Sequence, residues 1–290
     1  TKPTLVFGVA ALLLLIPVGY ALLFGFGPVP GLGAAGLGYA TAIVMWLEFI
    51  AFACYLRRSR HFRDLALLSH FEWPEFKAIK QLLVLGVPMG IAIFMEGSLF
   101  VATALLIGRL GAVDVAAHQI ALNVASASFM IPLGVALATT VRVGHAVGAR
   151  DYPAVRWAMK AGLFLVLITQ TLSALMLVFA GHWISSWYTD DAAIAGLAGT
   201  LMIYAAIFQY PDGIQALSGG ALRGLKDTKI PMFITVFAYW AVGLSAGVYL
   251  GLHQGLRAPG FWLGLSVGLS AAAILLYVRF WRTVNKLERA

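Results

Sequence analysis

Residues 81–107 read QLLVLGVPMGIAIFMEGSLFVATALLI, an apolar run with a single carboxylate, Glu96, near its middle. At about 1.5 Å per residue, a helix of this length reaches roughly 40 Å and exceeds the roughly 30 Å hydrocarbon core of a bilayer. An ionised side chain in lipid costs on the order of 3 kcal/mol, so a tolerated Glu usually faces protein or water. The run therefore predicts a transmembrane helix, bent near Gly86 and Pro88, with a functional acid. The alternative is a Glu96 that stays protonated and only hydrogen-bonds to a neighbouring helix.

The composition places the whole chain in a membrane. Hydrophobic residues make up 61% of the 290 residues, only 11% are charged, and the mean hydropathy is +0.89. A soluble domain of this size could not carry such a composition, and apolar runs near twenty residues exclude the alternating segments of a β-barrel. One cysteine, Cys54, excludes a disulfide framework and a Cys-based metal site. The sequence therefore predicts an all-α, polytopic membrane helix bundle.

The apolar runs and the basic residues together predict a topology. Eight spans are expected at 4–24, 33–56, 81–107, 114–138, 155–180, 193–222, 230–251 and 259–280. Placing the N-terminus and the even-numbered connections on one side collects 18 of the 20 Lys and Arg residues, and only Arg109 and Arg257 lie opposite. By the positive-inside rule both ends of the chain are cytoplasmic. Because the basic residues mark loops, they indicate topology and not nucleic-acid binding.

A faint internal repeat predicts the domain organisation. An offset of 228 residues lays the first hairpin on the last and pairs four identities: Pro3 with Pro231, Gly19 with Gly247, Gly36 with Gly264 and Leu37 with Leu265. A parallel repeat about the membrane normal would give this pattern, although Gly-rich apolar sequence also produces chance identities. We expect residues 1–56 to be the last two helices of a first six-helix lobe, 57–80 a basic linker compatible with a short interfacial helix, and 81–290 a second lobe. Four further helices are then expected before Thr1.

A second acid, Asp212, lies in the span 193–222, between Pro211 and Gly213. Proline removes a backbone donor and glycine loosens the helix, so the pattern predicts a broken helix around a charge, as transporters use to hold a cation or pass a proton. The alternative is a proline kink beside an incidentally buried acid. At helical rise Glu96 lies about 24 Å and Asp212 about 16 Å from the cytoplasmic ends of their helices. Spacing alone therefore does not show that the two acids share a site.

Other polar residues within spans are weaker candidates. Glu48 lies about 13 Å from Arg57 at helical rise, which is equally consistent with function and with snorkelling. A polar stripe along the fourth span either lines water or joins helices by hydrogen bonds; it comprises His118, Gln119, Asn123, Ser126 and Ser128. The series Gly260, Gly264 and Gly268 predicts a helix-packing face.

An enzyme is not expected. The text GLSVG around Ser266 matches a serine-hydrolase pattern, but that motif needs a strand-to-helix turn and Ser266 lies within a continuous apolar run. No phosphate loop, zinc spacing or nucleotide fingerprint is present, so any work must be driven by an ion gradient or by a partner. No cofactor is expected beyond a coupling ion.

Several motifs resemble the multidrug and toxic compound extrusion (MATE) family, NorM branch. The text VDVAAHQIALNVASASFMIPLGVALATTVRVGHAVGA at 113–149 is similar to that family's signature region. IFMEGSLF at 93–100 looks like its seventh helix, FQYPDGIQALSGGALRGLKDT at 208–228 its tenth, and AYWAVGLSAGVYL at 238–250 its eleventh. The resemblance implies helices five to twelve of a twelve-helix, two-lobe transporter that exports amphipathic, often cationic drugs in exchange for sodium or protons.

The resemblance also assigns roles to residues. The family's cation site in the second lobe falls on Glu96 and Asp212, which would bind sodium if the protein is sodium-coupled. Phe208 stands where some members carry a tyrosine. Residues that could add ion or substrate contacts are Gln119, Asn123, Gln209, Tyr210, Thr41 and Glu48.

The coupling ion is expected to be a proton. Leu15 and Gly19 replace asparagines of similar members, so with Phe208 the chain lacks three oxygen ligands. Sodium requires several oxygen ligands, whereas a proton needs only a carboxylate that can accept it. The departures from the family pattern therefore favour proton coupling.

We therefore expect a cation-coupled multidrug antiporter of the bacterial inner membrane. Its expected partners are small-molecule drugs and the lipid bilayer, with no nucleic acid, and it is expected to act as a monomer. One rival is a flippase for lipid-linked sugars, which should line its cavity with cationic residues, although no Lys or Arg is expected mid-span. The other rival is a non-transporting membrane scaffold.

Overall fold

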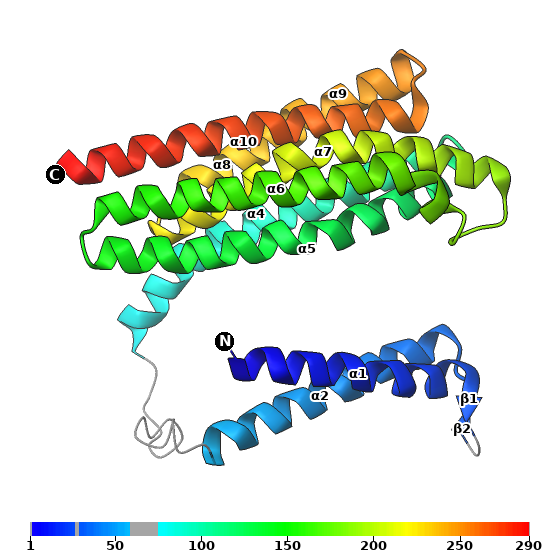
Figure 1. Cartoon of the computed structure of the whole chain (residues 1–290), viewed down its shortest axis with the longest axis horizontal. Helices are drawn as coiled ribbons and strands as arrows, with labels where there is room; N and C mark the ends of the chain where they lie inside the picture. Colours follow the sequence, from blue (N-terminus) through cyan, green and yellow to red (C-terminus); the bar gives the residue numbers. More distant parts are fainter. Residues whose placement is uncertain (1, 27–28, 59–74, 290) are drawn as a thin grey trace. The chain divides into compact units, whose positions relative to one another are not determined.

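The computed structural model describes residues 2–26, 29–58 and 75–289 and divides the chain into two compact units, Thr1–Glu75 and Phe76–Ala290. Figure 1 shows both units in the colours of the sequence. The predicted interfacial helix in the linker falls on 59–74, outside the described residues. The assignment of 1–56 to a first lobe stays a prediction.

The first unit is a helical hairpin. Helix α1 (Lys2–Phe24) contains Pro17 and is followed by a two-residue pairing of β1 (Gly25–Phe26) with β2 (Val29–Pro30), and then by α2 (Ala34–Arg58). The two helices meet closely near the turn, because a Cβ at Gly36 would lie 2.1 Å from the carbonyl oxygen of Leu22. The short β pairing is the one departure from an all-α fold within the described residues.

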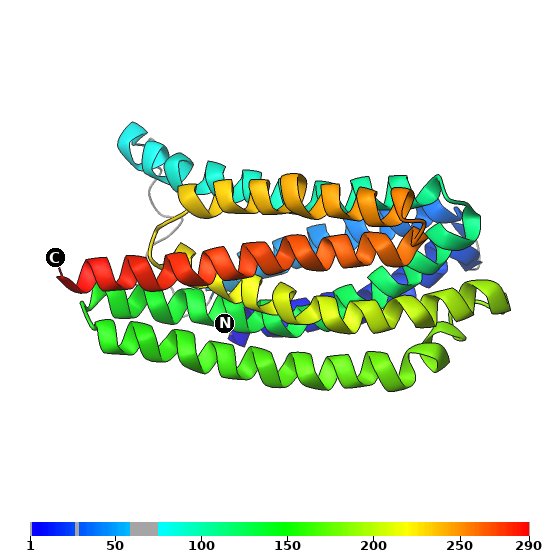
Figure 2. The same cartoon turned by 90° about the horizontal axis from the view of Figure 1, so that it is seen from above.

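The second unit is a bundle of long helices. Its elements are α4 (Phe76–Gly108), α5 (Ala112–Gly148), α6 (Tyr152–Ser185), α7 (Ala192–Gly224), α8 (Lys229–Val236), η1 (Phe237–Leu244), α9 (Ser245–Val248), η2 (Tyr249–His253) and α10 (Arg257–Arg289). The elements from α8 to η2 form one continuous span beside α4, and α10 packs along α7 (Figure 2). With α1 and α2, eight helices in the described parts of the chain are long and apolar enough to cross a membrane. The predicted helix bundle and its eight spans are confirmed.

Helix α7 lies at the centre of this bundle, packed against α5, α6 and α10. Small residues allow the close approach: a Cβ at Gly220 would lie 2.7 Å from the carbonyl oxygen of Ala136. At the same crossing the Thr140 hydroxyl donates a hydrogen bond to the Gly220 carbonyl, at 2.8 Å. Such glycine contacts and hydroxyl bonds hold helices together where lipid supplies no hydrophobic driving force.

The prediction of a broken helix at Asp212 is wrong. Helix α7 runs without interruption through Pro211, as α4 runs through Pro88. Helix α6 packs closely on this stretch, because the Gln170 side chain donates to the Gln209 carbonyl at 2.7 Å and lies 2.8 Å from where a Cβ at Gly213 would be.

The irregular helix is the span from α8 to η2, for which the sequence at 230–251 predicted a regular helix. Two of its segments, η1 and η2, are π-helical. Its glycines face those of α10, and a Cβ at Gly264 would lie 2.2 Å from the Cα atom of Gly247. The predicted packing face of Gly260, Gly264 and Gly268 is therefore confirmed, and its partner is a second glycine series, Gly243, Gly247 and Gly251.

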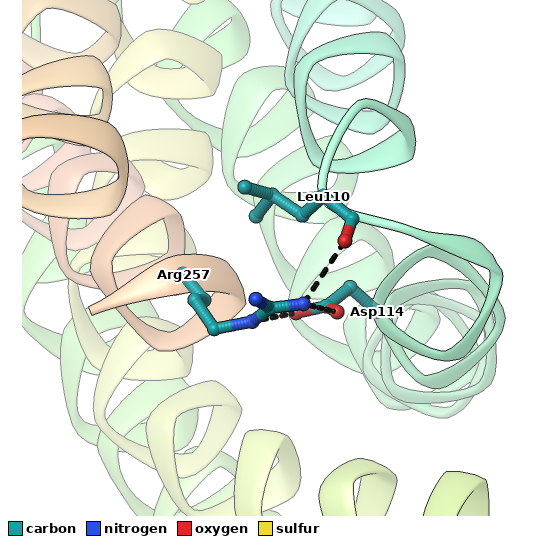
Figure 3. A network of polar contacts seen from close by, with 3 residues as sticks. All are labelled: Leu110, Asp114 and Arg257. Carbon is teal, nitrogen blue, oxygen red and sulfur yellow. Dashed lines mark hydrogen bonds and ion pairs between the residues drawn. The ribbon is translucent and has the colours of Figure 1, made fainter. Parts of the chain in front are cut away.

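Ion pairs join helices at both ends of the second unit. At one end the Arg257 guanidinium of α10 donates to Asp114 of α5, with Nε 3.2 Å from Oδ1, and to the Leu110 carbonyl at 3.0 Å (Figure 3). At the other end Arg279 Nε donates to Asp227 at 2.8 Å. The first pair joins the start of α10 to the first turn of α5, and the second joins α10 to the connection between α7 and α8.

Candidate functional site

Glu96 of α4 and Asp212 of α7 line one cavity of about 200 Å³. Its other walls are Phe100, Leu122, Ala125, Ser126, Phe129 and Phe208, so α5 closes the space between α4 and α7. The positions of the two acids along their helices did not show that they lie at the same depth in the membrane. The packing of α4, α5 and α7 brings both carboxylates to one cavity.

Neither carboxylate has a hydrogen-bond partner among the residues that the structure describes. Asp212 is only 7% exposed, Glu96 is half-buried, and the two interact electrostatically with each other. Two like charges repel each other, and burial among apolar side chains disfavours their ionised forms. The arrangement is therefore suited to holding at least one bound cation or proton.

A second, smaller cavity of about 50 Å³ also borders Glu96. Gln215, Arg223 and Asp227 line it, and Arg223 interacts electrostatically with Glu96. Arg223 lies one residue beyond the span predicted at 193–222, so its contact with Glu96 was not expected. The signal was its position eleven residues after Asp212, because about three helical turns return a side chain to the same face.

The shared cavity offers few oxygen ligands besides the two acids, whereas Gln215, Asp227, Thr228 and Thr235 line the small cavity beside Glu96. No cluster of three or more His, Cys, Asp or Glu side chains is found in the described part of the chain. Ser126 lines the cavity, and the buried amide of Gln209 has no partner for either its nitrogen or its oxygen within the described residues. Two carboxylates with these neutral groups fit a proton or a single monovalent cation.

The polar residues predicted to form one stripe along α5 do not share one environment in the structure. His118 is fully buried, with its ring 5.8 Å from that of Trp262, whereas Gln119 is exposed and exposed Asn123 accepts a hydrogen bond from the Tyr188 hydroxyl at 3.0 Å. Consecutive helix positions point about 100° apart, so His118 cannot share the face of Gln119. The predicted common face is wrong for His118.

Three further candidates lie outside the cavity. Tyr210 turns to α6, where its hydroxyl donates to Thr171 at 3.1 Å. Thr41 and Glu48 belong to α2 in the first unit, where the Thr41 hydroxyl donates to the Leu37 carbonyl at 2.8 Å and Glu48 is half-buried. Their predicted roles stay predictions.

Comparison with known proteins identifies the family. The family model described as MatE matches residues 88–248, which include Glu96, Asp212 and the cavity between them. The chain belongs to the MatE family. Among its MatE relatives, a probable multidrug resistance protein NorM of Xanthomonas campestris pv. campestris is 54% identical over 287 residues, covering 99% of this chain and 63% of the relative. The multidrug resistance protein PmpM of Pseudomonas aeruginosa is 40% identical over 293 residues, covering 100% of the chain and 61% of that protein.

Solved structures show the same MatE fold. The eukaryotic MATE transporter AtDTX14 superposes with a TM-score of 0.86 at 20% identity, over 99% of this chain and 64% of that one. A MATE crystal structure described as the straight conformation gives 0.86 at 18% identity, over 100% and 64%. The chain thus spans a little under two thirds of the length of the relatives it matches.

Proposed function

We propose that this MatE chain forms part of a cation-coupled antiporter that exports small amphipathic drugs by alternating access. Relatives described as multidrug resistance proteins support the drug as substrate. The observation that carries the coupling is the pair Glu96 and Asp212, which line one cavity without a hydrogen-bond partner among the described residues. A bound cation or proton neutralises the pair, and its exchange for a drug links the two movements.

Glu96 has the position that such an exchange requires. It borders both the cavity shared with Asp212 and the small cavity that contains Arg223, so it lies between two hollow spaces of the unit. A carboxylate in that position can take up an ion from one space and present it to the other. Alternating access would then consist of the rocking of two lobes around this level of the membrane.

The coupling ion is proposed to be a proton. The described cavity offers two carboxylates and few neutral oxygens, and Phe208 contributes a ring without a hydroxyl to its wall. Drug uptake into inverted vesicles tests this, with a pH gradient alone or a sodium gradient alone at clamped pH. We expect uptake with the pH gradient. Uptake that follows sodium and ignores pH would contradict proton coupling.

The test of the coupling site is Glu96→Gln in the full-length gene product, since this change preserves shape and removes the titratable charge. Efflux of a fluorescent cation from cells should be abolished at matched expression. Asp190→Asn is the control, because Asp190 is an exposed acid in the α6–α7 connection and does not line the cavity. Wild-type efflux by the Glu96→Gln variant would exclude the assignment.

The flippase alternative is favoured by one observation. Arg223 lines the small cavity beside Glu96, and Arg142 lines a separate cavity of about 890 Å³ between α5 and α6. Cationic residues of this kind could bind a lipid phosphate. Glu96→Gln separates the two functions, because it should abolish drug efflux, whereas a flippase would depend on Arg142 and Arg223. A scaffold would tolerate all of these changes.

The distribution of basic residues supports an orientation in the membrane. Basic residues of the second unit gather at the end that holds the α5–α6 and α7–α8 connections and the end of α10. By the positive-inside rule this end is cytoplasmic. We place the protein in the bacterial inner membrane as a monomer, with both ends of this chain in the cytoplasm.

A further inference from the structure

The start of α4 and the connection between α7 and α8 enclose a cavity of about 490 Å³ that has no part in the proposed mechanism. Its lining residues are Lys77, Lys80, Gln81, Val84, Leu85 and Lys226. Within the described part of the chain no acid lines it, so three ammonium groups share one space. Figure 2 shows the start of α4 and the α7–α8 connection at the same end of the bundle as the C-terminus. The cavity therefore gathers positive charge at the basic end of the second unit.

These lysines have no carboxylate partner among the described residues. The ion pairs found there all involve arginines, and Asp227, which follows Lys226 in the chain, is bound by Arg279 at 2.8 Å. Helix α4 has no acid in its first turn, and the positive end of its dipole adds to the charge of Lys77 and Lys80. Like charges at such a short range repel each other, so the cavity favours an anion.

The polarity of the cavity changes along α4. Lys77, Lys80 and Val84 lie at intervals of three and four residues, so they share one helix face. Lys80 directly precedes the apolar run 81–107, whereas Val84 and Leu85 lie about one turn deeper in it. Val84 is 46% exposed and Leu85 is half-buried, so both offer an apolar surface below the ammonium groups. A matching ligand carries an anionic group next to a hydrocarbon part.

The place of the cavity in the membrane fits such a ligand. The basic residues put this end of the unit on the cytoplasmic side. The cytoplasmic leaflet contains anionic lipids, and basic pockets between transmembrane helices on that side bind their headgroups. A cationic drug would be repelled by the three lysines. A free phosphate ion would leave the apolar surface of Val84 and Leu85 unused.

We propose that this cavity binds the phosphate headgroup of an anionic phospholipid of the cytoplasmic leaflet. The ammonium groups of Lys77, Lys80 and Lys226 donate hydrogen bonds to the phosphate oxygens, and the first part of an acyl chain lies against Val84 and Leu85. Because Lys226 belongs to the α7–α8 connection, the bound lipid holds the start of α4 to the end of α7. Binding of the lipid does not depend on the proposed drug export.

The test is a titration of phosphatidylglycerol into the full-length protein in a neutral detergent. The readout is the midpoint temperature at which the protein ceases to be monodisperse on heating. We expect phosphatidylglycerol to raise the midpoint temperature of the wild type and phosphatidylcholine to leave it unchanged. The triple variant Lys77→Gln, Lys80→Gln and Lys226→Gln should need roughly a hundredfold more phosphatidylglycerol for half of the effect, which corresponds to about 1 kcal/mol for each lysine.

A second triple variant is the matched control. Lys160→Gln, Lys229→Gln and Lys286→Gln remove the same number of charges from exposed lysines of the second unit that do not line the cavity. This variant should respond to phosphatidylglycerol as the wild type does. Equal weakening by the two triple variants would show that only net charge attracts the lipid, and it would overturn the site.

The backbone of Lys226 allows lipid binding to be separated from folding. Its φ of 59° lies in the left-handed region, where a helix end usually has glycine. In detergent without lipid, Lys226→Gly should therefore have a midpoint temperature at least as high as that of the wild type, because the strain is relieved. The same variant should respond more weakly to phosphatidylglycerol. A wild-type response would overturn the role of Lys226 in the site.

Two further outcomes would overturn the proposal. A wild type that phosphatidylglycerol does not stabilise would show that the cavity takes no lipid in the full-length protein. Equal stabilisation by inorganic phosphate would show a site for a free anion in place of a lipid. Glu96→Gln leaves all three lysines in place and should keep the response to phosphatidylglycerol, so the lipid site and the proposed transport can fail separately.

Discussion

Gly264 of α10 lies directly against the backbone of Gly247 in α9, and this contact allows a quantitative prediction. In Gly264→Ala the new Cβ would lie 2.2 Å from both the Cα and the nitrogen atoms of Gly247. Carbon atoms normally approach to about 3.5–4.0 Å, so the two backbones must separate by roughly 1.5 Å. Overpacking typically costs about 1–3 kcal/mol, and we expect the upper end because no flexible side chain can move aside.

The measurement is the fraction of full-length protein that stays monodisperse in detergent after heating. Gly264→Ala should lower the midpoint temperature strongly, and Gly247→Ala less, since its Cβ would meet the Phe261 ring at 3.3 Å. Gly196→Ala is the matched control. It has nothing within 4 Å, and it should gain up to about 1 kcal/mol of helix propensity. Equal midpoint temperatures for Gly264→Ala and Gly196→Ala would refute the close contact between Gly264 and Gly247.

Three further predictions follow from the helix ends and from α7. Asp114→Leu should lower the midpoint temperature more than Asp114→Asn, because only the amide can still accept from Arg257; equal losses would argue against the hydrogen bonds in Figure 3. In a Cys54→Ser background, Gln254→Cys should react with an impermeant thiol reagent from outside the cell and Ala149→Cys should not, and the reverse pattern would invert the topology. Pro211→Ala should raise the free energy of unfolding by up to about 3 kcal/mol, because the alanine N–H can donate to the Ile207 carbonyl. We expect the variant to retain transport, because α7 is already an unbroken helix. Loss of transport in a stabilised variant would show that α7 bends there during the cycle.

The membrane spans could be predicted from the sequence because they depend on local properties. A run such as 81–107 is apolar over its whole length, and the polar backbone must be satisfied within the segment once it is in lipid. The glycine packing face of α10 could be predicted for the same reason. A spacing of four residues places Gly260, Gly264 and Gly268 on one side of a helix, whatever the helix packs against.

The site was predicted less completely because it depends on neighbours. Glu96 and Asp212 differ in depth when each is counted from its own helix end, and only the packing against α5 places them on one cavity. The uninterrupted course of α7 through Pro211 was not predicted either, because proline and glycine both disfavour a helix interior.

Within the described part of the second unit, two acids near the helix ends are paired with arginines, whereas the two acids that line the cavity are not. Asp114 is bound to Arg257 and Asp227 to Arg279, each across two elements, whereas Glu96 and Asp212 have no ion-pair partner there. A buried charge without a partner is costly, and a fold that pairs its terminal acids could have paired the central ones equally well. The cost is explained if the missing positive charge is mobile. Arg223 acts on Glu96 from the small cavity but forms no ion pair with either acid among the described residues, so a proton or a cationic drug can neutralise the acids in turn, as the proposed exchange requires.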